Sequence, residues 1–425
     1  MRRRFTIATD FAILSQKGLA MHHAPTKTDK EVNMFKRIVT TLAGLTALLI
    51  TTAVGAADPV KIGFSHSKTG IFAAAATSQL QSYELWREQL NAVGGLDIAG
   101  TRRKIEFIHY DDQSNSGKAV QIYEKLITDD KVDLLLAPWG TSLHFAIVGV
   151  ISRYKFPVVG NTAASVQLRD LKAGNIWFPT SLFPDRQSVE LAKLLKKQGV
   201  TSAARITNQL PYTQENKKFV VPALKEAGIK LLVNEDYPPN IKDMTALLTK
   251  VKKAKPQAVL SYTYPGDAVL YVKGAREVGL NAATQVVLLG PQYDFFAKIF
   301  GPTRNGLVTM GHWTPLRKDW PTAKVFFDDF KARWKTNADY LDAPLAYMSV
   351  QILQQAVAKA GLDKNKLRQV ISSTTFKSIN GPVRFKGVEN IALPTMISQI
   401  QNGQQHIVWP PDQATSKIIA KPAWK

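Results

Sequence analysis

The sequence predicts an α/β protein with two doubly wound lobes, and three observations support this fold class. Residues 60–112 read as a strand, a long amphipathic segment and a second strand, which is a βαβ unit. Residues 132–137 (VDLLLA) form a short, wholly apolar run, as expected for a parallel strand that helices cover on both faces. The alternation restarts after residues 177–185 (WFPTSLFPD), whose two prolines interrupt any helical period. We therefore expect two lobes joined by extended crossovers.

The first predicted lobe continues from the βαβ unit. A helix is expected at 118–129, because its apolar residues recur on one face. After the strand at 132–137 comes a turn at 138–142, where Thr141 or Ser142 is a candidate N-cap for the next helix. A strand at 156–160 and a loop at 161–165 follow. The order β-α-β-α-β-α-β is that of a doubly wound sheet.

The second predicted lobe repeats the pattern. Helices are expected at about 186–198, 214–227 and 243–253 and over the segment containing Ala268 and Val272, with strands at 202–206, 229–236, 257–262, 285–289 and 306–310. Two further helices, at 321–335 and 343–360, precede short strands at 382–385, 395–401 and 405–409, the last two joined by an Asn402-Gly403 hairpin turn. We assign 58–180 with 311–381 to the N-terminal lobe, 181–310 with 382–411 to the C-terminal lobe, and 412–425 to a tail.

The N-terminal segment predicts export. Residues 34–57 contain a basic start at Lys36 and Arg37, an uncharged apolar stretch and small-residue cleavage patterns at 54–57, as in a secretory signal peptide. The stretch is about as short as, or shorter than, a membrane-spanning helix needs. Residues 1–33 are then an over-extended leader, with translation starting at Met34, or a disordered one. We expect the mature protein in the periplasm.

Composition excludes several classes of function. The sequence has no Cys, which removes thiol nucleophiles, zinc-thiolate sites and disulfides, and its seven His show no metal-ligand spacing. The net charge is +22, but the lysines are interspersed with acidic residues, as on solvated helix faces, so we expect no nucleic-acid partner. The 425 residues suffice for two or three domains.

Motifs for enzymatic chemistry and cofactors are missing. The first βα turn, GFSHSKTG, is not GxGxxG, and the chain has no P-loop, HExxH or GxSxG. Asp111 and Asp112 could form a metal site, but neighbouring strand residues point to opposite faces, and we expect one to cap the next helix. His66 lies in a predicted cleft loop, where a hydrogen-bonding role is commoner than a catalytic one. We expect no enzyme, no cofactor and no metal.

The chain resembles the type I periplasmic substrate-binding proteins of ABC transporters, in the leucine/branched-chain amino acid-binding group. The resemblance covers about residues 60–411 and rests on VKIGFSHSKTG, NAVGGLDIAG, YDDQSN, VVGNTAAS, Tyr212, LLGP and NGPVRF, in this order. It implies two lobes with a three-stranded hinge and a ligand cleft between them. It also implies a small-molecule ligand, an ABC permease and its ATPase as partners, and a monomer.

The resemblance also implies the site. Thr141, with Ser142 beside it, falls where the family binds the ligand carboxylate, and helix-start N–H groups suit an anion. Thr162 and Ala164 fall on the second such loop, and Tyr212 and Tyr264 on aromatic positions of the second lobe. His66 completes the expected cleft set.

Two departures leave the ligand open. The family usually has a Glu after the Gly-Pro of LLGP, to pair with the ligand ammonium, whereas this chain has Gln292; Asp342 could compensate. Trp139 replaces an aliphatic pocket residue, and two family cysteines, near Ser114 and Gly140, are absent. We expect capture of an amino acid-like or organic-acid ligand for an ABC importer. The alternatives are an aromatic acid or amide ligand, a sensing module for a membrane receptor, an exported enzyme and a structural surface protein.

Overall fold

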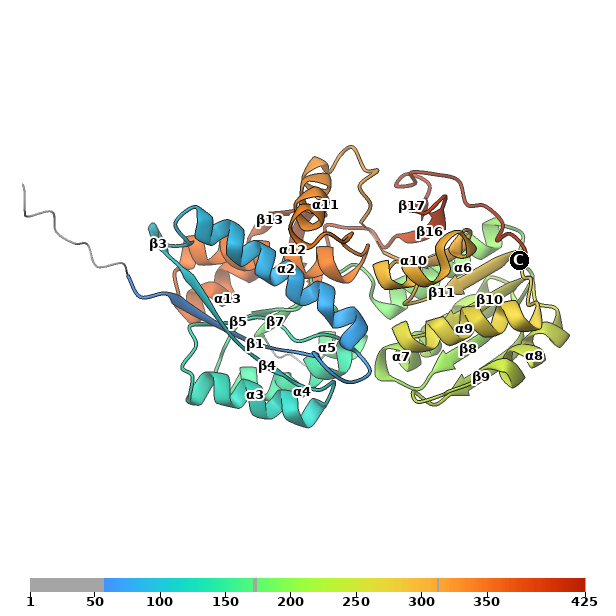
Figure 1. The fold of residues 1–425 in the computed structure, drawn as a ribbon, viewed down its shortest axis with the longest axis horizontal. Helices are drawn as coiled ribbons and strands as arrows, with labels where there is room; N and C mark the ends of the chain where they lie inside the picture. The colour runs from blue at the N-terminus through green and yellow to red at the C-terminus, as the bar shows by residue number, and fades with distance from the viewer. Residues whose placement is uncertain (1–56, 171–173, 312, 425) are drawn as a thin grey trace, which may run out of the picture. The chain divides into compact units, whose positions relative to one another are not determined.

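The computed structural model describes residues 57–170, 174–311 and 313–424. The expected leader (1–33) and signal peptide (34–57) lie outside these residues, apart from Ala57. Residues 58–425 form one unit, in which two α/β lobes are visible (Figure 1). Among the described helices, none has both the length and the apolar composition needed to cross a bilayer.

The first lobe begins with the predicted βαβ unit. Strands β1 (Val60–His66) and β4 (Ile105–Asp111) pair in parallel over their full length, and β5 (Leu134–Leu135) pairs with the other edge of β1. A second parallel pair joins β6 (Val158–Val159) to β7 (Ile176–Trp177), and a hairpin joins β2 (Leu96–Ile98) to β3 (Thr101–Arg103). The helices of this part are α2 (Ala73–Ala92), α3 (Ser116–Thr128), α4 (Thr141–Arg153) and the short α5 (Val166–Asp170).

The second lobe contains a seven-stranded sheet in the order β17-β16-β12-β11-β10-β8-β9. Its parallel strands are β8 (Ser202–Asn208), β9 (Lys230–Tyr237), β10 (Ala258–Tyr262), β11 (Thr284–Val287) and β12 (Leu307–Met310), and the antiparallel hairpin of β16 (Ile397–Gln401) and β17 (Gln404–Trp409) extends it. The lobe also contains α6 (Pro184–Lys197), α7 (Pro211–Glu226), α8 (Thr245–Ala254), α9 (Pro265–Val278), α10 (Asp294–Phe300) and a 3-10 turn, η1 (Gly301–Arg304). Strands β8, β10, β11 and β12 are almost wholly buried, as expected for parallel strands that helices cover on both faces, whereas the edge strand β9 is largely exposed or half-buried.

The chain then returns to the first lobe. Helices α11 (Pro321–Trp334) and α12 (Asp342–Ala360) pack against α2, and α13 (Lys364–Ser373) packs against α12. Strand β14 (Gly381–Lys386) lies between β13 (Thr375–Ser378) and β15 (Glu389–Asn390), and Glu389 bridges to Phe178. The predicted lobe boundary at residue 382 therefore moves to after β15, because β14 pairs within the first lobe.

Three chain segments connect the lobes: residues 179–183, 311–320 and 391–396, of which 312 is not described. The first and third are tied together, because Thr395 Oγ1 donates to the Ser181 carbonyl at 2.6 Å. The predicted tail is not separate from the second lobe. Lys421 N–H donates to the Ala283 carbonyl, and the Trp424 indole N–H donates to the Leu280 carbonyl.

Candidate functional site

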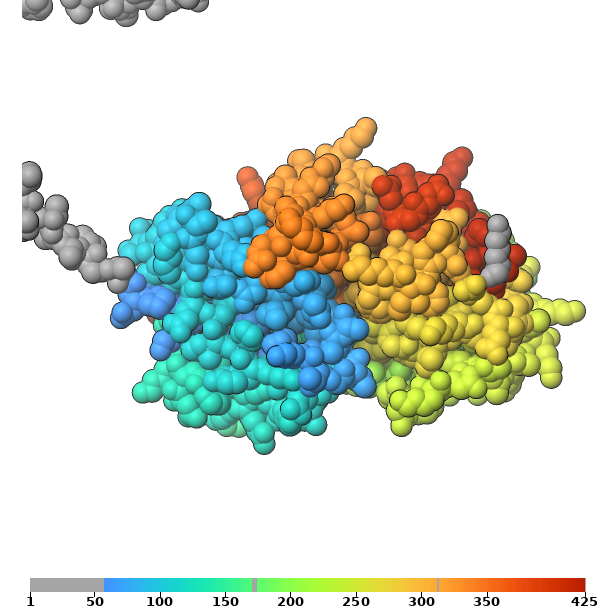
Figure 2. All heavy atoms as spheres, in the orientation of Figure 1, coloured from blue at the N-terminus to red at the C-terminus, as the bar shows by residue number. Residues whose placement is uncertain are grey.

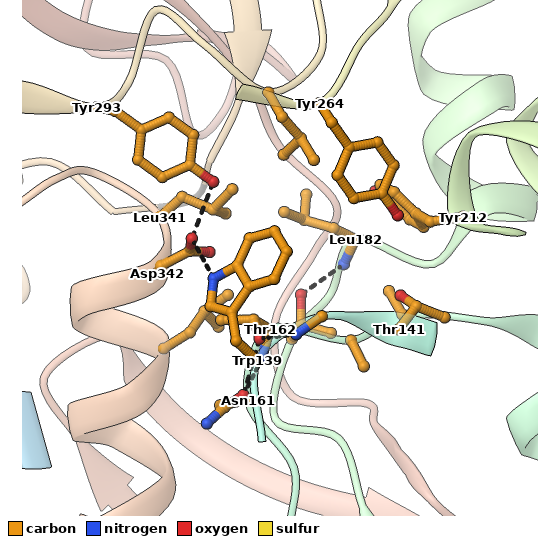
Figure 3. A pocket seen from close by; sticks show the side chains of 16 residues that line it. Trp139, Thr141, Asn161, Thr162, Leu182, Tyr212, Tyr264, Tyr293, Leu341 and Asp342 are labelled. Atoms are coloured by element: carbon orange, nitrogen blue, oxygen red, sulfur yellow. Dashed lines mark hydrogen bonds between the residues drawn. The ribbon is translucent and has the colours of Figure 1, made fainter. Parts of the chain in front are cut away.

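A cavity lies where loops of both lobes meet. Its volume is about 430 Å³, including open solvent, so it suits a small organic molecule as its ligand. Figure 3 shows the lining side chains converging on this space. The lining comprises Trp139, Gly140, Thr141, Asn161, Thr162, Ala163, Ala164, Thr180, Leu182, Tyr212, Tyr264, Leu289, Tyr293, Leu341, Asp342 and Leu345.

The start of α4 offers hydrogen-bond donors to the cavity. Gly140 is the N-cap residue, with a φ of 80°, and no side chain in the described part of the chain caps the helix. The candidate caps, Thr141 and Ser142, are instead the first two helical residues, and only Thr141 lines the cavity. Because the first N–H groups of an uncapped helix lack partners within the helix, this end is suited to bind an anion.

His144 holds the two loops of this end together. Its Nε2 accepts from the Asn161 N–H at 3.4 Å, so Nδ1 carries the proton and donates to the Gly140 carbonyl at 2.8 Å. Complete burial lowers the pKa of His144 to about 4, so the imidazole is neutral at pH 7. Thr162 Oγ1 accepts from the Gly140 N–H at 2.7 Å, which adds a second tie between the loops.

Aromatic rings form the walls of the cavity. Trp139 and Tyr264 come from different lobes, and their ring centroids are 6.4 Å apart. Phe72, at the start of α2, lies 4.9 Å from Trp139 and 5.8 Å from Tyr264. On the face shown in Figure 2, the blue surface of the α2 region meets the yellow surface of the second lobe. The Tyr212 hydroxyl donates to Gln187 Oε1 at 3.0 Å.

Asp342, at the start of α12, is the acidic residue of the lining. Its Oδ2 accepts from the Trp139 indole N–H and from the Tyr293 hydroxyl, each at 2.8 Å (Figure 3). Burial, reinforced by the neighbouring carboxyl of Asp339, raises the pKa of Asp342 well above its usual range. Among the described residues, no hydrogen bond reaches Asp342 Oδ1. The cavity therefore contains a carboxyl group that is strongly biased toward its neutral form.

Six of the nine expected site residues line the cavity together: Trp139, Thr141, Thr162, Ala164, Tyr212 and Tyr264. Gln292 does not, because its side chain is used inside the second lobe: Oε1 accepts from Gly290 N–H and Thr309 Oγ1, and Nε2 donates to the Leu288 carbonyl. The neighbouring Tyr293 lines the cavity instead.

His66 also lies away from the cavity. It ends β1 and packs beside His109, with ring centroids 5.0 Å apart. The expected helix cap from Asp111 or Asp112 is wrong as well: Asn115 caps α3, and Asp112 accepts from Ser65 and Ser67. Within the described ranges, no group of three or more His, Asp or Glu side chains is placed to hold a metal ion.

Sequence reasoning missed several cavity residues. They are Gly140, Asn161, Ala163, Thr180, Leu182, Leu289, Tyr293, Leu341 and Leu345. Asn161 follows strand β6 and Leu289 follows strand β11, at the ends of the strands that face the cavity. Their location after a strand was therefore the one signal that the sequence offered. Thr180 and Leu182 lie on a crossover, and Leu345 on a helix face, where the sequence carries no signal that distinguishes lining from core.

Comparison with known proteins agrees with this architecture. A family model described as periplasmic binding protein matches residues 59–404. The Leucine-, isoleucine-, valine-, threonine-, and alanine-binding protein of Pseudomonas aeruginosa is 24% identical over 336 residues, covering 78% of this chain and 86% of that protein.

Two solved structures share the fold. The branched-chain amino acid transporter substrate-binding protein of Streptococcus pneumoniae, in complex with isoleucine, has a TM-score of 0.73 at 19% identity and covers 85% of this chain and 100% of its own. A solute-binding protein of an ABC transporter from R. palustris, in complex with benzoate, has a TM-score of 0.72 at 21% identity, and the match covers 86% of this chain and 98% of that protein. The chain therefore belongs to the periplasmic binding protein family, in the type I group that includes the branched-chain amino acid-binding proteins of ABC transporters.

Proposed function

We propose that this protein captures a small carboxylate with an apolar or aromatic body in the interlobe cavity and delivers it to an ABC importer. The observation that carries the proposal is the state of Asp342, whose Oδ2 already accepts two hydrogen bonds from Trp139 and Tyr293. A group held in this way and biased toward neutrality is a poor counter-ion for a ligand ammonium.

The ligand carboxylate is assigned to the start of α4. Thr141 offers a hydroxyl there, and the uncapped helix offers N–H groups and the positive end of its dipole. The loop of Thr162 and Ala164 adjoins this end, and the hydrogen bond from Gly140 to Thr162 fixes its position. Among the described residues that line the cavity there is no Lys or Arg. The anion is thus held by dipoles and hydroxyls.

The body of the ligand is assigned to the aromatic walls. Tyr212 and Tyr264 approach from the second lobe, and Trp139 and Leu182 from the first lobe and its crossover. Offset or edge contacts between such rings and an aromatic ligand contribute about 0.5–1.5 kcal/mol each beyond burial. The R. palustris protein, whose solved complex contains benzoate, shows that this fold accommodates such a ligand.

A zwitterionic amino acid is the second candidate. It is favoured by Asp342 Oδ1, which no described donor reaches, and by the isoleucine in the S. pneumoniae complex. An ammonium at Oδ1 would restore the charge of Asp342 by lowering its pKa. The two candidates therefore differ in the protonation of one carboxyl group.

The experiment is mass spectrometry of molecules released from the purified protein, followed by calorimetric titration with aromatic acids, aliphatic acids and amino acids. Tight binding of an acid without an ammonium supports the proposal; binding of amino acids alone contradicts it. The variant Thr141→Val should weaken a carboxylate ligand about 10- to 100-fold, because a hydrogen bond to a charged group is lost. Thr141→Ser, which retains the hydroxyl, is the matched control.

Delivery, export and oligomeric state belong to the same proposal. Family members are periplasmic, and we propose that residues 34–57 direct this chain there and are cleaved. We propose a monomer whose lobes close on the ligand and then dock on a permease and its ATPase. Loss of uptake of the identified ligand after gene deletion supports transport. Retained uptake with lost chemotactic or transcriptional response points to a sensing role.

A further inference from the structure

Four charged side chains link the lobes away from the cavity. Arg169 on α5 and Glu389 on β15 belong to the first lobe, and Asp185 and Arg186 on α6 belong to the second. The Arg169 guanidinium pairs with Asp185 at 3.1 Å and also, through Nε, with Glu389. Arg186 Nη2 pairs with Glu389 Oε2 at 2.6 Å. The charges alternate along one continuous chain, Asp185–Arg169–Glu389–Arg186.

This chain of charges lies at the base of two of the three connections between the lobes. Asp185 and Arg186 directly follow the segment 179–183, and Glu389 stands just before the segment 391–396. Arg169 also lies over the ring of Phe183, 5.4 Å from its centroid, inside the first connection. None of the four residues lines the cavity.

The energy of these contacts depends on the angle between the lobes. The Glu389 side chain is 6% exposed and lies between two guanidinium groups, so it is shielded from salt and strongly dependent on its partners. A rotation about the connections moves α6 relative to α5 and β15. It therefore lengthens the Arg169–Asp185 and Arg186–Glu389 pairs while leaving contacts within each lobe intact.

We propose that Arg169, Asp185, Arg186 and Glu389 form a hinge lock that favours the arrangement in which both lobes enclose the cavity. The lock sets the fraction of molecules in this arrangement and thereby scales ligand affinity without touching the ligand. For any ligand of the cavity, the apparent association constant equals the intrinsic constant multiplied by the fraction of molecules in this arrangement.

The test measures lobe separation without a ligand, so it is independent of the proposed function. Because the native sequence has no Cys, spin labels can be placed uniquely on Gln121→Cys in α3 and Lys218→Cys in α7, both exposed and on opposite lobes. Electron–electron double resonance gives the distance distribution after unfolding and refolding have removed bound molecules.

Glu389→Gln, which keeps the shape of the side chain and removes its charge, should increase the population at long distances by about threefold or more. The matched control is Glu235→Gln, which breaks the Lys250–Glu235 pair inside the second lobe and should leave the distribution unchanged.

If Glu389→Gln prevents folding, Asp185→Asn carries the same test, because Asp185 is more exposed and pairs with Arg169 alone among the four. Equal distance distributions in the parent protein and the folded hinge variant would overturn the proposal. An equal shift in Glu235→Gln would also overturn it, since the effect would then be general.

Discussion

Tyr293 of the second lobe donates its hydroxyl hydrogen to Asp342 Oδ2 of the first lobe at 2.8 Å. Two residues that line the cavity are therefore joined by a hydrogen bond between the lobes. Tyr293 precedes α10 and Asp342 begins α12. Both side chains are buried. The bond can exist only when the lobes are together, which couples the cavity's polar end to closure.

Tyr293→Phe should therefore release ligand faster. The loss of one buried hydrogen bond costs about 1 kcal/mol, which corresponds to a roughly fivefold faster dissociation, measured by stopped-flow displacement. The control is Tyr271→Phe, which removes an equally buried hydroxyl that bonds Gln285 at 2.9 Å inside the second lobe. It should lower stability and leave dissociation unchanged; the same rate in both variants would contradict a closure role for Tyr293.

Asp342→Asn separates the two ligand candidates. An acid without an ammonium should bind the variant within about threefold of the parent protein, because the neutral carboxyl and the amide have similar shape and polarity. A zwitterionic ligand should lose about 2–5 kcal/mol, or more than about 30-fold in affinity, since its ammonium loses a buried partner. Calorimetric titration of both ligand classes against both proteins gives the answer.

Gln292→Glu should destabilise the protein and leave ligand preference unchanged. The new carboxylate would face the Leu288 carbonyl, to which Gln292 Nε2 now donates at 3.1 Å, so a donor is lost in a buried site. We expect a loss of about 1–3 kcal/mol in the free energy of unfolding, measured in urea. Gln209→Glu, at an exposed position, is the control. Improved binding of amino acids by Gln292→Glu would show that the side chain reaches the ligand after all.

His144 should make stability depend on pH. Its pKa is lowered from 6.5 to about 4 in the folded protein, so the unfolded chain binds the extra proton as pH falls. The contribution of His144 to the free energy of unfolding is fully present above pH 6.5. It decreases by about 3 kcal/mol as the pH falls from 6.5 to about 4. Buried His66 and half-buried His109, whose pKa values desolvation also lowers, act in the same direction, and Asp342, with a raised pKa, acts oppositely.

The contribution of His144 is therefore measured by comparing the pH dependence of stability in a variant and in the parent protein. Urea unfolding at both ends of this pH window should show a smaller loss for His144→Gln, which does not titrate, than for the parent protein. Equal losses would mean that the imidazole is already charged, or solvated, in the folded protein.

The sequence was sufficient for the order of the elements because hydrophobic periodicity is local. The βαβ unit at 60–112 and the restart after residue 185 both appear as predicted, since buried parallel strands need apolar runs whatever the ligand. The lobe of β14 was not predictable in the same way. Its residues, GPVRFK, alternate as any half-buried strand would, and only pairing with β13 assigns it to the first lobe.

The candidate site shows where such reasoning ends. The family resemblance implied the places of Thr141 and Tyr264 in the site, and both stand at or just before the start of a helix that follows a strand, where doubly wound folds bind ligands. Gln292 and Tyr293 are neighbours in one loop, and the choice between them depends on Thr309 and Gly290, which turn Gln292 inward. His66 fails for a simpler reason: it follows the same face of β1 as Phe64, against His109.

The strand order of the second lobe has a consequence for a chain made from its N-terminus. Strand β12 is complete at residue 310, but its partner β16 begins at residue 397, after the whole return through the first lobe. Until those residues emerge, one edge of a largely finished sheet stays unpaired and can recruit strands from other molecules. The second lobe therefore needs chaperone protection for longer during synthesis than the first lobe does. A chain that lacked about its last thirty residues would have no β16 or β17, so this edge of the sheet would remain unpaired.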